Sequence, residues 1–152
     1  MRLKFLPSFV KRRGRITKKQ EENLKNLSNF ALEDMNDLQE ECIKFYSCCL
    51  EIGFGNAENI TQQALSNPEV LFIGSEVYMS GIGTLLGNIK ESNINNVRIF
   101  PDDIRILLDK NSIEIFDAIK IICPDPWPKE RHHKRRLINN DFLRMLNNSM
   151  KT

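Results

Sequence analysis

Residues 48–57 read CCLEIGFGNA, a short apolar run that leads into a turn containing two glycines. The run predicts a buried strand, and Gly53 and Gly55 predict a tight turn whose backbone can approach a ligand closely. A helix is expected after the turn, through about Ser66, with Asn67 and Pro68 ending it. This strand–turn–helix unit indicates an α/β fold.

Strands and helices alternate along the rest of the chain. Further strands are expected over 70–74, 96–100 and 115–123, and a helix over 79–92. A short helix should follow residue 103, and Asn140 or Asp141 should cap a last helix. Repeated strand–helix–strand units predict a parallel sheet with right-handed crossovers.

Residues before the first strand have a different character. Residues 1–19 form a basic arm, and Thr17 with Gln20 forms a capping box that predicts a short helix from about Lys18. Residues 28–46 are only loosely helical in spacing. The chain is therefore divided into a basic N-terminal arm with a helical linker, 1–46, and an α/β core, 47–152.

The formal net charge of +2 conceals basic ends around an acidic body. Residues 1–20 contain eight cations and no acid, and residues 129–152 contain seven cations and two acids. Blocks of this kind favour contact with nucleic acid, the alternative being solvated loops. No apolar stretch approaches the ~20 residues of a membrane span. The four cysteines lack C-x-x-C spacing, which favours reduced thiols in a cytoplasmic protein without a metal site.

An acid lies at or near the end of each predicted strand: Glu51, Glu76, Asp103 and Asp125. Parallel strands place these ends along one rim of the sheet, where α/β proteins bind ligands. Glu76 follows Gly53 by 23 residues, close to the ~20-residue offset of acids that bind ribose hydroxyls. The pattern favours a nucleoside-type cofactor. Asp102 competes with Asp103 for the third position, and helix capping is the alternative role for both.

Residues 124–137 read PDPWPKERHHKRRL. Asp125 lies between two prolines that restrict the backbone, and Trp127 follows. Five cations then suggest a ligand that carries phosphates: Lys129, Arg131, Lys134, Arg135 and Arg136. An acid, an aromatic ring and cations together suggest chemistry on a nucleobase.

These stretches closely resemble the tRNA (guanine-N7-)-methyltransferase family of bacteria. The resemblance runs over 8–18 (SFVKRRGRITK), 50–55 (LEIGFG), 72–77 (FIGSEV), 124–129 (PDPWPK) and 131–137 (RHHKRRL), and so spans nearly the whole chain. The PDPW run with its basic tail is highly specific to that family, whereas the G-x-G turn is common to S-adenosylmethionine-dependent methyltransferases.

The resemblance implies a Rossmann-like methyltransferase fold with an incomplete parallel sheet of strand order 3-2-1-4. It implies that S-adenosylmethionine is bound by Glu51, Glu76, Asp103 and Asp125 beside Gly53 and Gly55. It also implies that Asp125 is catalytic, that Lys129 and the neighbouring cations bind tRNA, and that guanine N7 in the variable loop is the target.

Three departures from the family pattern stand out. Ala57 replaces a usual glycine, residues 78–81 (YMSG) replace His-x-Pro-Gly, and the chain stops at Thr152, where the family continues through further strands. The fourth strand is therefore expected at an exposed edge that a partner chain or a missing segment would complete. A non-catalytic tRNA- or RNA-binding remnant is the alternative function. An NAD-binding fold is disfavoured because the third glycine of G-x-G-x-x-G is absent.

Overall fold

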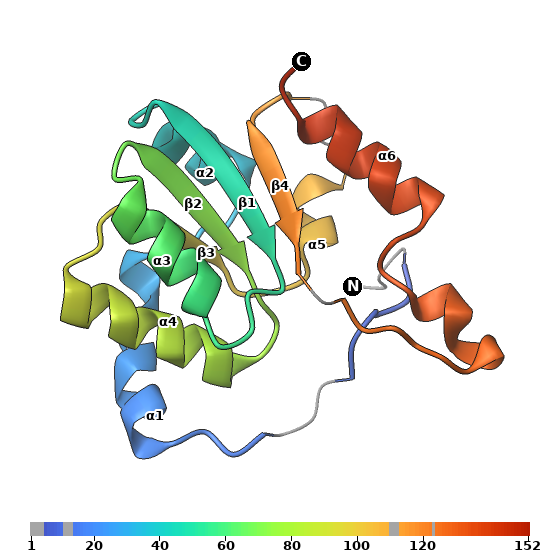
Figure 1. Ribbon diagram of the computed structural model, residues 1–152, viewed down its shortest axis with the longest axis horizontal. Helices are drawn as coiled ribbons and strands as arrows, with labels where there is room; N and C mark the ends of the chain where they lie inside the picture. The colour runs from blue at the N-terminus through green and yellow to red at the C-terminus, as the bar shows by residue number, and fades with distance from the viewer. Residues whose placement is uncertain (1–4, 11–13, 110–112, 123) are drawn as a thin grey trace.

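A computed structural model describes residues 5–10, 14–109, 113–122 and 124–152 of the chain. Its centre is a parallel sheet of four strands, β1 (Ser47–Ile52), β2 (Val70–Ser75), β3 (Val97–Phe100) and β4 (Ala118–Ile121). The strands lie in the order β3-β2-β1-β4 (Figure 1). The predicted parallel sheet of order 3-2-1-4 is therefore confirmed.

The helices follow the predicted pattern closely. They are α1 (Lys18–Leu24), α2 (Met35–Cys42), α3 (Glu58–Ser66), α4 (Met79–Ser92), α5 (Ile104–Leu108) and α6 (Asn140–Ser149), with 3-10 helices η1 (Leu27–Asn29) and η2 (Glu130–Arg135). The capping box of Thr17 and Gln20 is confirmed. The predicted cap of the last helix was wrong, because Asn139 accepts the Phe142 N–H there. None of the described helices is long and apolar enough to cross a bilayer.

Two hydrophobic cores cover the two faces of the sheet. Helices α2, α5 and α6 pack on one face, and α1, α3 and α4 pack on the other (Figure 1). Side chains of β1 alternate between the faces, so Leu50 and Ile52 enter the first core while Glu51 points towards Asn59 of α3. Residues before Ser47 also contribute to both cores: Leu32 and Leu38 belong to the first, and Leu24 and Leu27 pack against the second. A domain boundary between residues 46 and 47 stays a prediction.

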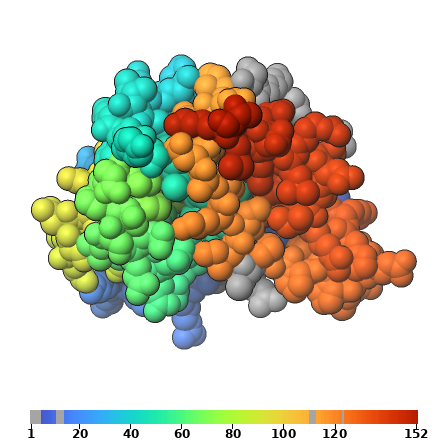
Figure 2. All heavy atoms as spheres, turned by 45° about the horizontal axis from the view of Figure 1, so that its top comes forward, coloured from blue at the N-terminus to red at the C-terminus, as the bar shows by residue number. Residues whose placement is uncertain are grey.

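β4 is shorter than the strand predicted over 115–123, whose position 123 lies outside the described residues. The start of that segment pairs elsewhere: the Phe116 N–H donates to the Ser149 carbonyl, and the Lys151 N–H donates to the Phe116 carbonyl. Figure 2 shows the end of the chain, in dark red, against this orange segment. β4 lies at the sheet edge, as predicted, and residues 149–151 pair with Phe116, which precedes it.

The turn after β1 is left-handed at three alternate positions. Gly53, Gly55 and Ala57 have φ angles of 70°, 57° and 65°. A non-glycine residue in this region is strained by about 1–2 kcal/mol. Ala57 is fully buried at the N-cap of α3 and belongs to the core under that helix. The alanine therefore adds backbone strain, while its methyl group fills the core and leaves the outer surface of the turn uncrowded.

Candidate functional site

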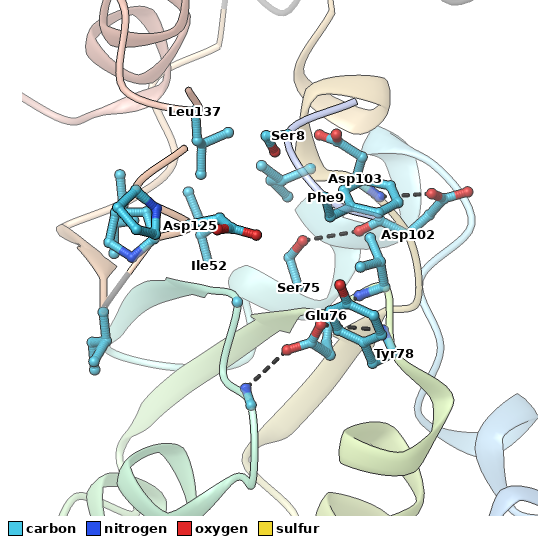
Figure 3. A pocket seen from close by; sticks show the side chains of 18 residues that line it. Ser8, Phe9, Ile52, Ser75, Glu76, Tyr78, Asp102, Asp103, Asp125 and Leu137 are labelled. Carbon is cyan, nitrogen blue, oxygen red and sulfur yellow. Dashed lines mark hydrogen bonds between the residues drawn. The ribbon is translucent and has the colours of Figure 1, made fainter. Parts of the chain in front are cut away.

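A cavity of about 410 Å³ opens at the carboxyl edge of the sheet (Figure 3). Its walls come from the ends of all four strands and from the N-terminal arm. The sequence-predicted residues that it brings together are Gly53, Gly55, Glu76, Asp103 and Asp125. This volume is typical of small-molecule sites.

Glu76 is buried beside this cavity, and its carboxylate holds the glycine turn in place. Its Oε2 accepts the Gly55 N–H at 2.8 Å, and its Oε1 accepts the N–H groups of Val77 and Tyr78 at 2.8 and 3.2 Å. A carboxylate has about four acceptor sites. These three contacts leave one site on Oε2, which suits a ligand hydroxyl donor.

Asp103 is buried and engaged by Arg105. The guanidinium donates from Nε to Oδ1 at 3.0 Å and from Nη2 to Oδ2 at 2.7 Å, and the Arg105 N–H also bonds Oδ1. The Asp102 carboxylate accepts the Asp103 N–H, and the Asp102 main-chain carbonyl accepts the Ser75 hydroxyl. Both aspartates line the cavity. Asp103 thus combines the predicted capping role with an ion pair, whereas Asp102 is the more exposed of the two.

Glu51 lies on the other side of the glycine turn. It lines a neighbouring cavity with Asn59, and the two cavities share Gly53, Gly55 and Ile122. Burial raises the pKa of the Glu51 carboxyl, and the Asn59 amide, which donates to Oε2 at 2.8 Å, acts in the opposite direction. Because side chains of β1 alternate between the two faces of the sheet, Glu51 lies on the opposite side of the glycine turn from the acids of the main cavity.

Asp125 is exposed at the mouth of the main cavity, and its side chain points inwards (Figure 3). β4 ends at Ile121, so Asp125 is held by the loop and not by the strand itself. Pro124, Pro126 and Leu137 also line the cavity. The segment 124–137 therefore starts and ends at the rim of the cavity.

Trp127 is the centre of this basic loop, residues 124–137. Its indole Nε1–H donates to the Ser8 carbonyl at 2.8 Å, the Arg135 guanidinium lies 5.2 Å from the ring centroid, and His132 packs edge-on at 5.4 Å. Its φ of 40° is unusual for a bulky residue. Trp127 is half-buried and thus organises the loop from within.

The five predicted phosphate-binding cations all lie on η2 or beside it. Arg135 is half-buried against Trp127, and Arg136 donates from Nε to the Pro126 carbonyl at 3.0 Å. The others, Lys129, Arg131 and Lys134, are exposed. The structure therefore presents exposed cations on a short helix directly beside the Asp125 cavity.

The contact between His132 and Trp127 predicts a pH-dependent fluorescence change. Desolvation, followed by the charges of Arg131 and Arg135, lowers the pKa of His132 from its ordinary value of 6.5. The ring is therefore mostly neutral at pH 7, and the midpoint at which its protonated form, which quenches indole emission, replaces the neutral one should lie below 6.5. Emission from Trp127, the only tryptophan, should fall through that transition.

The matched pair His132→Asn and His133→Asn identifies the source of the fluorescence change. His133 faces the Pro128 carbonyl, at 3.3 Å from Nε2, so its loss should leave the transition in place. His132→Asn should abolish it. A transition that survives in His132→Asn would show that the edge-on contact does not form in solution.

Four residues contribute to the site without having been predicted as site residues. Ser8 and Phe9 of the arm line the cavity, Tyr78 lines it from the start of α4, and Arg105 holds Asp103. Arg105 follows an acidic pair on a short apolar helix, a position that predicts solvent exposure. Only the structure shows that the residue is 5% exposed.

The chemistry of the cavity restricts what it can hold. Four carboxylates line it: Glu76, Asp102, Asp103 and Asp125. These groups suit a ligand with hydroxyl or amino donors and positive charge, and they oppose an anionic pyrophosphate. The apolar walls from Ile52, Ile104 and Ile121 suit a flat ring. A cationic nucleoside therefore fits better than a dinucleotide.

Comparison with solved structures supports the fold. An antibiotic-related methyltransferase superposes with a TM-score of 0.60 at 20% identity, over 80% of this chain and 61% of that chain. A 16S rRNA (adenine(1408)-N(1))-methyltransferase W203A mutant from Catenulisporales acidiphilia, with cosubstrate SAM, superposes with a TM-score of 0.55 at 19% identity, over 78% of this chain and 58% of that one. The predicted Rossmann-like methyltransferase fold is confirmed.

Sequence comparison identifies the family. A family model described as "Putative methyltransferase" matches residues 46–152. The tRNA (guanine-N(7)-)-methyltransferase of Neorickettsia sennetsu is 39% identical over 148 residues, and that of Hyphomonas neptunium is 49% identical over 102 residues. These alignments cover 96% and 67% of this chain, and 64% and 47% of the relatives' own lengths. The chain therefore belongs to the methyltransferase family of this model, among relatives named tRNA (guanine-N(7)-)-methyltransferase.

Proposed function

We propose that this chain binds S-adenosylmethionine in the cavity beside Glu76 and transfers its methyl group to guanine N7 of tRNA. The observation that carries the proposal is the junction of two sites: an acidic nucleoside-sized cavity opens directly beside the basic loop. The relatives at 39% and 49% identity support the choice of substrate.

The residues of the cavity fit this cofactor by their chemistry. The remaining acceptor site of Glu76 suits a ribose hydroxyl, and Asp102 or Asp103 suits the adenine amino group. Glu51, buried across the glycine turn, suits the amino-acid end, because a nearby ammonium group would offset the cost of ionising this acid. The cofactor supplies an electrophilic methyl group on a sulfonium centre.

The basic loop supplies the RNA-binding side of the proposal. Lys129, Arg131 and Lys134 are exposed and would contact the phosphate backbone, which fixes register and orientation. Arg135 and Arg136 are tied to Trp127 and Pro126, so they also hold the shape of the loop. Phosphate contacts here would bring a nucleobase to the mouth of the cavity.

The proposed reaction needs positioning more than proton transfer. Guanine N7 carries a lone pair and no proton, so the chain has no proton to remove before attack. Alignment of N7 with the methyl group would supply most of the rate enhancement. Asp125, which points into the cavity from the rim, would orient the guanine or the cofactor.

Two measurements test the proposal: calorimetric titration with S-adenosylmethionine, and methyl transfer to unmodified tRNA. We expect binding and transfer by the parent chain, and a loss of turnover of about 100-fold in Asp125→Asn. Asp141→Asn is the matched control, because that side chain is 96% exposed on α6, and it should retain full turnover.

Each contrary result has a distinct meaning. Full turnover by Asp125→Asn would reject the role of that acid. Binding of tRNA without binding of the cofactor would reject methyl transfer by this chain and support the alternative, an RNA-binding remnant.

A further inference from the structure

The N-terminal arm forms one wall of the cavity. We call residues 5–10 the strap; its Ser8 and Phe9 line the cavity. Three alternate carbonyls of the strap accept side-chain hydrogen bonds: that of Leu6 from Arg105, that of Ser8 from Trp127 and that of Val10 from Tyr78. The distances are 3.1, 2.8 and 2.9 Å.

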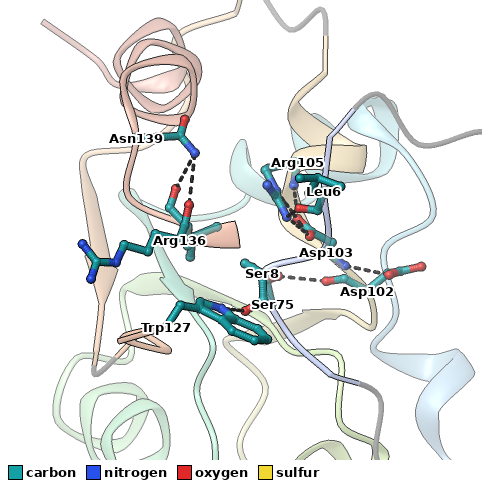
Figure 4. A network of polar contacts seen from close by, with 10 residues as sticks. Leu6, Ser8, Ser75, Asp102, Asp103, Arg105, Trp127, Arg136 and Asn139 are labelled. Atoms are coloured by element: carbon teal, nitrogen blue, oxygen red, sulfur yellow. Dashed lines mark hydrogen bonds and ion pairs between the residues drawn. The ribbon is translucent and has the colours of Figure 1, made fainter. Parts of the chain in front are cut away.

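The three donors come from segments that follow three different strands. Tyr78 follows β2, Arg105 follows β3 and Trp127 follows β4. Figure 4 shows the strap passing between Arg105 and Trp127, with its carbonyls directed at each. The same sheet edge that forms the cavity therefore also holds its N-terminal wall.

Arg105 joins the strap to an acid of the site through a single buried side chain. Its guanidinium is buried, bonds both oxygens of Asp103, donates to the Leu6 carbonyl, and lies 4.0 Å from the centroid of the Phe5 ring. Desolvating a cation is costly unless all its donors are used and its partners are well placed. The proposed methyl transfer gives Arg105 no role.

We propose that Arg105 is a positioning residue of the cofactor site, which fixes the Asp103 carboxylate and seats the strap against the cavity through Leu6 and Phe5. The inference rests on the proposed function, since the ligand is taken to be S-adenosylmethionine. Seating of the strap slows escape of the ligand past Ser8 and Phe9, and a ligand that packs on Phe9 stabilises the seated strap in return.

The geometry needs an arginine. The planar fork can reach a carboxylate and a carbonyl at the same time while its face covers an aromatic ring. A lysine would keep the positive charge but offer a single nitrogen, so it could pair with Asp103 and lose the strap. Arg105→Lys therefore separates the positioning role from the charge.

The test compares Arg105→Lys with Arg98→Lys. Arg98 on β3 is a close match, because it too pairs with a carboxylate, that of Glu41, and its guanidinium lies 5.8 Å from the centroid of Phe30, away from the cavity. We expect Arg105→Lys to raise the Kd for S-adenosylmethionine about tenfold, mainly through faster dissociation. Arg98→Lys should leave the Kd unchanged.

A double-mutant cycle shows whether Arg105 acts through the strap. Phe5→Leu removes the ring under the guanidinium while leaving Arg105 and Asp103 intact. If the two residues act together, the double variant should bind no more weakly than Arg105→Lys alone. Fully additive effects on the Kd would overturn the proposal. Phe5→Leu also tests it independently should Arg105→Lys fail to fold.

Trypsin cleavage of the arm gives a readout that needs no cofactor. The arm contains several lysines and arginines on either side of the strap. Cleavage there should be faster in Arg105→Lys than in the parent or in Arg98→Lys, and equal rates would overturn the proposal. If the parent fails to bind S-adenosylmethionine, the proposed function falls, while the cleavage rates still decide whether Arg105 holds the strap.

Discussion

Replacing Gly81 by alanine is expected to weaken binding of S-adenosylmethionine by at least about 100-fold, because it displaces the glycine turn. A Cβ at this position would lie 2.2 Å from the Gly55 carbonyl oxygen and 3.6 Å from Cγ of Glu76. The first contact is with backbone, which cannot rotate away. The Gly55 N–H bonds Glu76, so movement of the turn also disturbs that carboxylate.

Gly87→Ala provides the matched control for this prediction. It lies on the same helix, α4, and its added Cβ would meet the terminal amide nitrogen of Asn23, a flexible side chain that can move aside. Both substitutions replace a glycine of α4 by alanine, and only Gly81→Ala meets backbone, so their difference reports the clash. Calorimetric titration of both variants measures it. Equal Kd values for Gly81→Ala and the parent would show that the turn adapts without loss.

The sheet was predictable because its information is local. Each strand is a short apolar run, each connection is a helix with an apolar face, and this alternation alone predicts parallel pairing. The length of β4 was not predictable, because Phe116 is as apolar as Ile119 or Ile121 of that strand but pairs with Met150. The cap of α6 was ambiguous for a related reason: Asn139, Asn140 and Asp141 are all good caps, and burial of Phe142 and Leu146 fixes the phase.

The acids of the site were predictable as a set, but their arrangement was not. Position at a strand end identifies Glu76 and Asp103 as cavity residues, and the spacing from Gly53 singles out Glu76. The separation of Glu51 depends on which face each β1 residue occupies. Since Leu50 and Ile52 enter the core under α5 and α6, Glu51 must face α3.

The hydrogen bonds of the strap left no trace in the sequence pattern. All three are accepted by main-chain carbonyls of Leu6, Ser8 and Val10, which any residue would provide. The donors lie 68 to 119 residues further along the chain. A contact between a distant side chain and a backbone carbonyl imposes no residue type at the acceptor, so no motif can report it.

Glu76→Gln is expected to impair both the fold around the cavity and the binding of S-adenosylmethionine. The carboxylate accepts three N–H groups, two on Oε1 and one on Oε2. A glutamine amide has only one acceptor oxygen, so either orientation places its NH₂ group against a backbone donor. The buried donors left unpaired should cost about 1–3 kcal/mol of the free energy of unfolding.

Affinity should fall as well, by about 100-fold in Kd, because the ribose acceptor and the Gly55 contact are disturbed together. Urea unfolding measures the first effect and calorimetric titration the second. Glu40→Gln is the control, because Glu40 is exposed on α2 and lines neither the main cavity nor the cavity beside Glu51. It should match the parent in both measurements.

The two measurements on Glu76→Gln separate two roles of one carboxylate. If only stability fell, Glu76 would be a structural acceptor for the turn, and the proposed ribose contact would be wrong. If both fell, the acid would serve the turn and the ligand together, because the Oε2 that accepts the Gly55 N–H also keeps the acceptor site for the ligand hydroxyl. That result would account for the buried acid at the end of β2, which would fix the turn through Gly55 and offer its remaining acceptor site to the ligand.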